Sequence, residues 1–322
     1  MITMKNKSIA VAYPTIPIVF VSSVHPDRIP LHNTMGLAVT DLKEEVRSET
    51  AIEVTRKKNE TTMFLEGKEM PKERMASVIK VANIFRKKTG SDAGLKITSN
   101  NYKIYSGSSD SGAAALVCAL DDIFGTGLNQ EELSELGMMV SESAIRSIYG
   151  GMNELNVDNY PKFHGKLVAS VNDLKGLKIF ALTFDYPTRV SAEQIFHATR
   201  SSPFYEYRLK MVPIWIAKIK LGLLNNDWKT VFSVAEENCA NAHYLIESAG
   251  LRCRKKEMMN ACIDVEEIRA EGLPCYWTAG GGRVINVFSW GKEAEKVKKE
   301  LIKRGYKPIE YKVAPSPKII KR

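Results

Sequence analysis

Residues 107 to 116 read G-S-S-D-S-G-A-A-A-L, a loop of glycine and hydroxyl residues followed by an alanine-rich apolar run. Such a loop at the start of a helix is typical of a phosphate site, because glycines let the backbone approach an anion and the first-turn amides point at it. Serine hydroxyls can add hydrogen bonds to phosphate oxygens or bind Mg²⁺. The alternative is a core helix whose serines satisfy only its own amides. The stretch alone predicts the helix and leaves both roles open.

The loop differs from the two common phosphate-binding motifs. Gly107 and Gly112 fit the first part of G-x-x-x-x-G-K-[ST], but Ala113 and Ala114 stand where lysine and serine or threonine belong. No G-x-G-x-x-G follows a predicted strand. A Walker A loop is therefore excluded, and a dinucleotide-binding fold has no support.

Composition limits the class of protein and of partner. The chain has 322 residues, 44% of them hydrophobic and 26% charged, which is ordinary for a soluble globular protein with a large core. Its net charge is +9, but the basic residues are scattered along predicted helix faces rather than clustered with aromatic residues. This pattern disfavours nucleic acid as a partner and favours an anionic small molecule.

Cysteine and histidine usage indicates neither a metal site nor a disulfide framework. The five cysteines form no C-x-x-C pair and their number is odd, and the five histidines are dispersed. The amino end, M-I-T-M-K-N-K, passes directly into a strand-like run, and no apolar stretch reaches membrane-spanning length. We therefore expect a cytoplasmic protein with no secretory leader and no membrane partner.

The predicted elements run strands then helices in the first half, and strand, helices, hairpin and helix in the second. This order predicts an α+β fold with two lobes. Asn129 is predicted to cap a helix that runs through Ile148. Pro213 is expected to kink or divide a helix over residues 191–222, and the tail after Tyr311 is expected to be loose.

Four motifs along the chain resemble those of one enzyme family. The loop at 107–116 resembles A-S-S-A-A-G-x-A-A-L, and residues 141–151, S-E-S-A-I-R-S-I-Y-G-G, with Glu154 beyond, resemble S-G-S-A-C-R-S-L-[YF]-G-G-x-x-E. Residues 12–16, A-Y-P-T-I, resemble A-x-x-N-I-A, and residues 278–282, T-A-G-G-G, occupy the place of D-A-G-P-N. The resemblance is to the mevalonate diphosphate decarboxylase branch of the GHMP kinases, and within it to the archaeal mevalonate 3-kinases.

The resemblance implies a two-lobed GHMP-kinase fold. Residues 1–177 would form a ribosomal-S5-like α/β lobe with the ATP loop, and residues 178–322 a ferredoxin-like lobe that completes the substrate pocket. It also implies ATP and Mg²⁺ as cofactors, with no residue assigned to the metal, and a homodimer. The residues expected to contact ATP are Asn101, Gly107, Ser108, Ser109 and Asp110.

Departures from the decarboxylase pattern concern the substrate. Thr278 stands where the decarboxylases have an aspartate, and the apolar Phe20 lies in the segment where they hold the substrate diphosphate with lysine and tyrosine. An unpaired phosphate beside an apolar ring would be costly. Glu142, which replaces a glycine, matches the mevalonate 3-kinases and can accept a hydrogen bond from a hydroxyl. Together these residues imply an uncharged 5-position and no decarboxylation.

Arg146 lies in the second motif, and its guanidinium suits a bidentate contact with the C1 carboxylate of mevalonate. Without the motif it would be an ordinary helix-surface ion pair. Arg189 follows a predicted strand and is a second substrate candidate, with a solvated loop arginine as its alternative. The candidate catalytic residues are Ser106, Arg146 and Thr278. The candidate substrate-binding residues are Phe20, Glu142, Arg146, Ser147 and Arg189.

These inferences favour an ATP-dependent kinase that phosphorylates the tertiary 3-hydroxyl of mevalonate, without decarboxylation, in isoprenoid precursor synthesis. Phosphoryl transfer depends mainly on positioning and charge neutralisation, so loss of the aspartate need not abolish it. Decarboxylation instead develops positive charge at C3, which a threonine cannot stabilise. Two alternatives remain: a decarboxylase of a phosphorylated mevalonate with an altered site, and a GHMP-fold sensor that binds nucleotide without catalysis.

Overall fold

The computed structural model describes residues 4–186 and 190–320 of the chain. Its strands are β1 (Lys7–Ala12), β2 (Thr15–Val19), β3 (Thr34–Asp41), β4 (Arg47–Thr55), β5 (Thr61–Leu65), β6 (Lys68–Glu69), β7 (Gly94–Tyr102), β8 (Met152–Asn156), β9 (His164–Ala169), β10 (Leu177–Thr183), β11 (Tyr276–Ala279), β12 (Val284–Trp290), β13 (Ile309–Val313) and β14 (Lys318–Ile319). Its helices are α1 (Lys72–Thr89), α2 (Ser108–Phe124), α3 (Gln130–Met138), α4 (Ala144–Tyr149), α5 (Ala192–Ser201), α6 (Tyr205–Leu224), α7 (Trp228–Ser248), α8 (Lys256–Ala270) and α9 (Ala294–Lys303). The predicted α+β class is confirmed.

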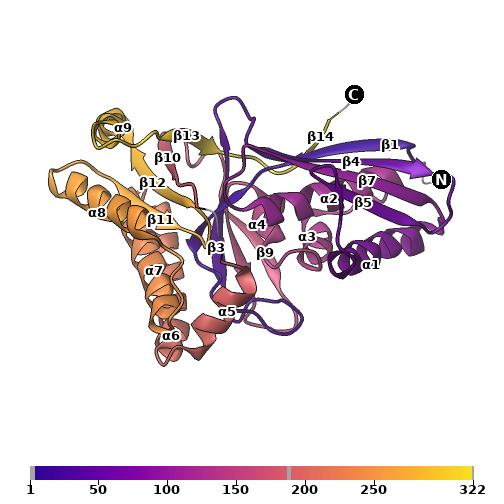
Figure 1. Cartoon of the computed structure of the whole chain (residues 1–322), viewed down its shortest axis with the longest axis horizontal. Coiled ribbons are helices and arrows are strands. Elements are labelled where there is room, and N and C mark those ends of the chain that lie inside the picture. The colour runs from indigo at the N-terminus through magenta and orange to yellow at the C-terminus, as the bar shows by residue number, and fades with distance from the viewer. Residues whose placement is uncertain (1–3, 187–189, 321–322) are drawn as a thin grey trace.

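One sheet has six strands in the order β14-β1-β4-β7-β5-β6, and helices α1 and α2 cover one of its faces (Figure 1). Helix α2 packs across β1 and β4, and its alanines, such as Ala114 and Ala115, are fully buried. Small side chains let a helix lie close to a sheet. This contact fixes the start of α2 and the loop before it.

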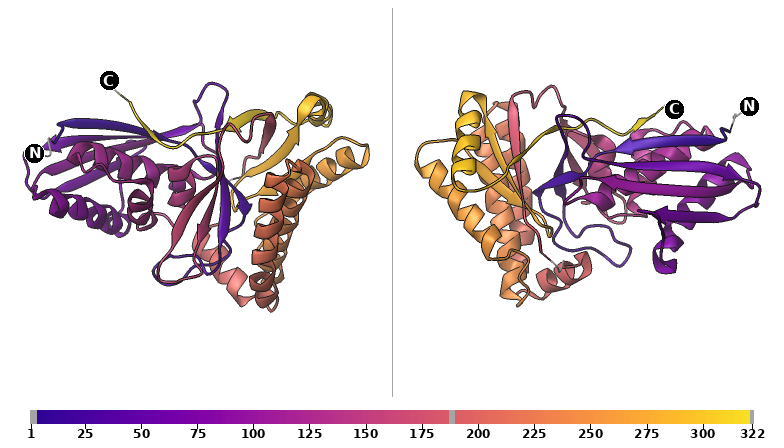
Figure 2. Two further views of the ribbon diagram at one scale, coloured as in Figure 1. Left: turned by 180° about the vertical axis from the view of Figure 1, so that it is seen from behind. Right: turned by 45° about the horizontal axis from the view of Figure 1, so that its top comes forward.

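The second sheet has the order β11-β12-β10-β13-β3-β8-β9, with β2 paired to β3. Helix α7 lies on β11 and packs along α6, and α8 stands beside them at the end of the molecule away from the first sheet (Figures 1 and 2). The apolar side chains of these helices and of the sheet form a large core that includes Trp215, Phe232 and Phe288. The site described below lies between these two parts of the fold.

Strands from the two halves of the sequence share sheets. β13 pairs with β10 on one side and with β3 on the other, and β14 pairs with β1. The prediction of a loose tail after Tyr311 is therefore wrong, because strands near the amino end take up the backbone hydrogen bonds of this segment. Strands from both sides of residues 177 and 178 pair in the second sheet. The predicted lobe boundary at this point therefore does not coincide with a break between sheets, and it stays a prediction.

Residues 191–222 form two helices, α5 and α6, but the division falls at residues 202–204. Pro213, which was expected to kink or divide the segment, lies inside α6 and does not divide it. Its side chain is exposed, so water can satisfy the carbonyl that the proline ring leaves without a donor. The helix therefore continues past the proline.

The helix predicted from Asn129 begins as expected and ends early. Asn129 caps α3 through a capping box with Glu132, whereas α3 stops at Met138 and α4 begins only at Ala144. Within this break, Ser141 donates a hydrogen bond to the carboxylate of Asp110 in α2. The interruption brings the second motif against the first.

Across the described ranges, no helix is both long and apolar enough to cross a membrane. All five cysteines are free thiols.

Candidate active site

The loop before α2 depends on a glycine. Gly107 adopts a φ of 77° and a ψ of 17°, and a Cβ at this position would lie 2.7 Å from the backbone nitrogen of Thr15. Helix α2 then begins at Ser108, so residues 108–112, which were expected to form a loop before the alanine run, make up its first turn instead. No side chain in the described part of the chain caps its amino end. Its first-turn amides are therefore available to an anion, and the helix dipole favours negative charge there.

A cavity of about 130 Å³ opens in front of this loop. Its walls come from β2 and the residues after it, the start of α2, the α3–α4 connection, α5 and the turn between β11 and β12. The sequence-predicted candidates that line it are Phe20, Ser106, Gly107, Ser109, Asp110, Glu142 and Arg146. Motifs that are far apart in the sequence thus meet in one cavity.

A buried ion pair joins two of these candidates. Arg146 Nη2 lies 3.2 Å from Asp110 Oδ2, and neither side chain is more than 10% exposed. Thr15 donates a hydrogen bond to the same carboxylate oxygen, and Ser141 donates to the other at 3.4 Å. Burial raises the pKa of Asp110, against the opposing effects of Arg146 and Thr15. Arg146 is therefore not the helix-surface residue of the alternative interpretation.

The guanidinium of Arg146 is not fully used by this pair. Within the described residues, its Nε has no hydrogen-bond partner, although the atom is buried. Buried donors are normally paired, and a guanidinium can bind a carboxylate through two parallel hydrogen bonds. The unpaired Nε leaves Arg146 able to bind an anionic ligand in the cavity.

Arg146 lies directly over Gly36 of β3, a residue that sequence analysis did not single out. A Cβ at Gly36 would lie 2.2 Å from Arg146 Cδ and 2.8 Å from its Cγ. No side chain larger than hydrogen fits beneath the arginine in its present position. A glycine inside a strand often marks such a close approach, and this was the available sequence signal.

Glu142 is held by a second arginine that sequence analysis missed. Arg28 Nη2 lies 2.7 Å from Glu142 Oε2, and Arg28 Nη1 lies 3.3 Å from Glu193 Oε1. Arg28 follows β2 and has a φ of 69°, whereas Glu193 is in the first turn of α5. The guanidinium thus connects the amino-terminal segment, the α3–α4 connection and α5.

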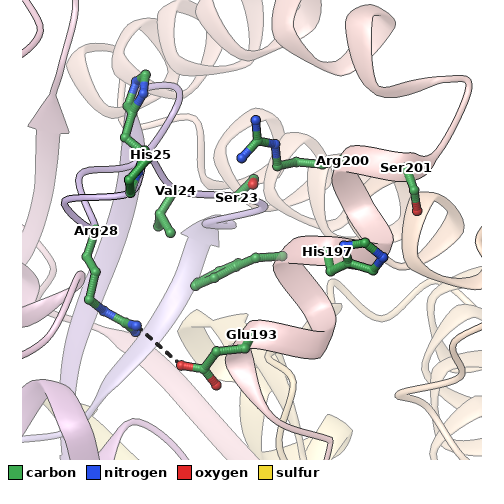
Figure 3. Close-up of a pocket in the computed structure, with 10 residues that line it drawn as sticks. Ser23, Val24, His25, Arg28, Glu193, His197, Arg200 and Ser201 are labelled. Atoms are coloured by element: carbon green, nitrogen blue, oxygen red, sulfur yellow. Dashed lines mark hydrogen bonds and ion pairs between the residues drawn. The ribbon is translucent and has the colours of Figure 1, made fainter. Parts of the chain in front are cut away.

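A wider pocket of about 530 Å³ lies beside the cavity (Figure 3). His25 and Arg28 reach it from the amino-terminal segment, and Glu193, His197 and Arg200 reach it from α5 (Figure 3). The Arg28–Glu142 ion pair joins the linings of the two spaces.

Ser106 lies against the glycine turn between β11 and β12. A Cβ at Gly282 would lie 3.1 Å from Ser106 Oγ, and one at Gly280 would lie 3.4 Å from it. A Cβ at Gly281 would lie 2.3 Å from Ile195 Cδ1 of α5. The fourth motif therefore packs against both the phosphate-type loop and α5, and the glycines leave room for the Ser106 hydroxyl.

Two of the predicted residues lie beside the cavity without lining it. Thr278 is fully buried in β11, and its hydroxyl has no partner in the part of the chain that the structure describes. The Ser147 hydroxyl donates to the carbonyl oxygen of Tyr13 at 2.7 Å. Glu154, at the end of the second motif, forms an ion pair with Lys220 of α6. These contacts tie the motif to the rest of the fold.

The predicted nucleotide residues differ in position. Ser109 is exposed at the start of α2, next to the partly buried Ser108. Asn101 lies at the end of β7, where its Oδ1 accepts a hydrogen bond from Ser48 at 2.6 Å. Arg189, the second substrate candidate, lies outside the described residues.

Comparison with known proteins finds relatives in the family that the sequence motifs resemble. Residues 24–162 match the family model of the diphosphomevalonate decarboxylase-like N-terminal domain. The chain is 28% identical to a mevalonate-3-kinase of Picrophilus torridus, in an alignment of 293 residues that covers 88% of this chain and 89% of the relative. It is 29% identical over 279 residues to a mevalonate 3-kinase of Thermoplasma acidophilum, covering 85% of each. Over most of its length, the chain is therefore similar to mevalonate 3-kinases, and residues 24–162 are similar to the amino-terminal domain of the diphosphomevalonate decarboxylases.

Solved structures of this branch share the fold. A mevalonate-3-kinase from Thermoplasma acidophilum, with mevalonate 3-phosphate and ADP bound, superposes with a TM-score of 0.88 at 24% identity and 99% coverage of both chains. A mevalonate diphosphate decarboxylase from Staphylococcus aureus gives 0.87 at 23% identity and 98% coverage of both. The GHMP-kinase fold predicted from the motifs is confirmed.

The GHMP family implies Mg²⁺, and the cavity offers few ligands of its own. Among the described residues, no group of three or more His, Cys, Asp or Glu side chains could hold a metal. Asp110 and Glu142 line the cavity, and each is ion-paired with an arginine. Because Mg²⁺ keeps several waters and binds through one or two carboxylates plus substrate phosphates, this donor set fits an ion that enters with a nucleotide.

Proposed function

We propose that this protein is an ATP-dependent kinase that phosphorylates the tertiary 3-hydroxyl of mevalonate and releases 3-phosphomevalonate without decarboxylation. Two relatives named mevalonate 3-kinase align with most of the chain. A structurally similar mevalonate-3-kinase was solved with mevalonate 3-phosphate and ADP bound. The observation that carries the proposal is one cavity in which an uncapped helix start, a buried arginine with an unpaired donor and an apolar wall meet.

The nucleotide half of the site is the start of α2. The phosphates of ATP lie against the amides of residues 107–110, with the adenine toward Asn101 at the end of β7. This placement uses the amides that the helix leaves unpaired and the dipole at its amino end. The Ser109 hydroxyl and the Asp110 carboxylate are the groups that would hold Mg²⁺, which neutralises charge on the transferring phosphoryl group when bound.

The acceptor half lies between Arg146 and Phe20. Arg146 binds the C1 carboxylate of mevalonate through its Nε, the guanidinium nitrogen without a partner among the described residues, while Nη2 stays paired with Asp110. Phe20 walls the part of the cavity that receives the 5-position, and Glu142 accepts a hydrogen bond from a hydroxyl there. An anionic 5-phosphate is disfavoured by the ring and by the carboxylate.

Catalysis then rests on positioning. With the carboxylate on Arg146 and the phosphates on the loop, the tertiary hydroxyl lies between the two and attacks the γ-phosphorus in line. The bond from this phosphorus to the β–γ bridging oxygen breaks, ADP leaves with that oxygen, and the hydroxyl proton passes to an oxygen of the transferred phosphoryl group. Ser106 lines the cavity between the loop and the glycine turn, and in this proposal its hydroxyl hydrogen-bonds the reacting oxygen. Asp110 keeps Arg146 in place through its ion pair.

Decarboxylation does not follow because, among the described residues, no carboxylate is available to stabilise positive charge at C3 of the substrate. Phosphate departure and loss of CO₂ would develop positive charge there, and Thr278 offers only a buried hydroxyl on that side. The two carboxylates that line the cavity are neutralised by Arg146 and Arg28. We therefore expect the 3-phosphate to leave the enzyme intact.

The experiment that tests this function is incubation of the protein with Mg-ATP and mevalonate labelled at C1. ADP and 3-phosphomevalonate should form in equal amounts, with no labelled CO₂. Enzyme-dependent CO₂ release at a rate close to that of ADP formation would restore the decarboxylase. Parallel incubations with 5-phosphomevalonate and 5-diphosphomevalonate measure the preference for an uncharged 5-position, and binding of ATP without turnover of any acceptor would favour the sensor.

Assembly and location are further expectations of the resemblance. We propose a homodimer in the cytoplasm, and sedimentation of the purified protein at several concentrations tests the dimer.

A further inference from the structure

Arg208 of α6 is fully buried, and among the described residues no carboxylate pairs with it. Its guanidinium donates to oxygens of neutral groups, at 3.0 Å to Asn241 Oδ1 and 3.3 Å to the carbonyl oxygen of Asn238, and lies 5.7 Å from the Trp215 ring. Burial lowers the pKa of Arg208 to about 10. Burying a cation without an anion is costly, so its contacts with neutral groups must be favourable enough to offset that cost.

The shortest of these contacts holds the backbone of Phe20. Arg208 Nη2 donates to the carbonyl oxygen of Phe20 at 2.8 Å, and the amide of Phe20 donates to Asn238 Oδ1 at 3.0 Å. Arg208 Nη2 also lies 3.4 Å from Asn238 Oδ1, which closes the ring of contacts. Phe20 follows the last residue of β2, so two side chains supply the hydrogen bonds that a strand neighbour would otherwise make.

The ring of Phe20 is held from the other side by apolar packing. It belongs to a small buried cluster with Ile195, Ala242 and Ile246, and its centroid lies 6.0 Å from that of His243. Burial lowers the pKa of His243 to about 3, so this neighbour is neutral at physiological pH and adds no second charge. The same Phe20 lines the acceptor cavity.

We propose that Arg208 and Asn238 are positioning residues that set acceptor specificity by fixing Phe20. They clamp its backbone from α6 and α7, so the ring closes the part of the cavity that receives the uncharged end of the acceptor. Neither residue lines the cavity, so both act through Phe20. The inference rests on the proposed function in taking the Phe20 side of the cavity as the acceptor side.

A double-mutant cycle between Arg208→Lys and Phe20→Ala tests this role. A lysine cannot make the forked contacts, so R208K should raise the KM for the acceptor about five-fold or more while the KM for ATP changes less than about two-fold. In the F20A background, the same change should alter the acceptor KM less than about two-fold. An equal fold-change in both backgrounds would mean that Arg208 only holds the fold together, and would overturn the proposal.

The matched control is Asn241→Ala, which removes a partner of Arg208 and leaves both bonds to Phe20. Its acceptor KM should stay within about two-fold of wild type. If R208K does not fold, Asn238→Ala and Asn238→Asp replace it: the aspartate keeps an oxygen for Phe20 and should retain the wild-type KM, whereas the alanine should raise it. Equal KM values for the two variants would contradict the clamp. The cycle uses whichever acceptor the wild-type protein turns over, so failure of the mevalonate assignment is seen separately, in the wild-type assay.

Discussion

Adding one methyl group beneath Arg146 probes the acceptor site from a residue that itself touches no ligand. In Gly36→Ala, the new Cβ would lie 2.2 Å from Arg146 Cδ. Ordinary contacts begin near 3.4 Å, so the stem of the arginine has to retreat by about 1.2 Å unless the strand moves. A shift of this size carries the guanidinium away from Asp110 and from the position proposed for the mevalonate carboxylate.

Misplacement of a substrate-binding group by about 1 Å can cost on the order of 100-fold in rate. We therefore expect kcat/KM for mevalonate to fall by about 10- to 100-fold, equivalent to roughly 1.4–2.7 kcal/mol of transition-state stabilisation. The KM for ATP should change little, because the loop at Gly107 is untouched. Coupled ADP-release kinetics with each substrate varied in turn measure both effects, and a thermal melt reports the stability cost, about 1–3 kcal/mol for an overpacked site.

Gly165→Ala is the matched control. In β9 the added Cβ would lie 2.3 Å from Tyr149 Cε2 and 2.6 Å from Ile145 Cδ1. This overlap with side chains of α4 is comparable in size, but its nearest atoms do not belong to Arg146. It should lose stability to a similar extent and keep nearly wild-type kinetics. The reasoning is refuted if folded G36A has the kinetics of wild type, or if G165A loses as much activity as G36A.

Arg146→Lys keeps the charge and loses the planar fork, so steady-state kinetics should show KM raised or kcat lowered by about ten-fold or more; unchanged kinetics would make Arg146 purely structural. Ser109→Glu places a carboxylate where the phosphates bind and should abolish ATP binding in a nucleotide titration, and a wild-type isotherm would remove the loop as the phosphate site. Burial lowers the pKa of His32 and of His243 from 6.5 to about 3, so the unfolded chain binds more protons as pH falls through 6.5. Together they should lower the free energy of unfolding by about 4 kcal/mol between pH 7.5 and 5, and His243→Asn should roughly halve that loss; urea titrations with no such difference would contradict the neutral buried histidines.

Sequence patterns predicted the elements whose signals are local. The alanine run from Ala113 gave α2, and Asn129 with Glu132 gave the start of α3, because packing face and capping depend on residues within a few positions. The strand at 309–313 was missed because its stability comes from pairing with β3 and β10, which are distant in sequence. The same holds for the hydrogen bond from Ser141 to Asp110, which needs the break between α3 and α4.

The candidate site divides in the same way. The family motifs led to Phe20, Ser106 and Arg146, which the fold does bring to one cavity. The motifs say nothing of what holds these residues: Gly36 beneath Arg146 and Arg208 behind Phe20 belong to elements that meet only in the folded chain. Their sequence neighbourhoods are those of an ordinary strand and an ordinary helix, so the supporting residues required the structure.

The late pairing of β13 with β3 has a consequence for synthesis on the ribosome. Asp41 of β3 pairs with Tyr311 of β13, about 270 residues downstream, so this edge of β3 stays unpaired until β13 has been synthesised. At about 5–20 residues per second, that edge stays open for roughly 15 to 55 seconds after it emerges. During this time the open strand edge can pair with other nascent chains. Premature stops shortly before residue 309 should therefore yield aggregated protein rather than a truncated enzyme, because this edge of β3 is covered only once residues 309–313 have been made.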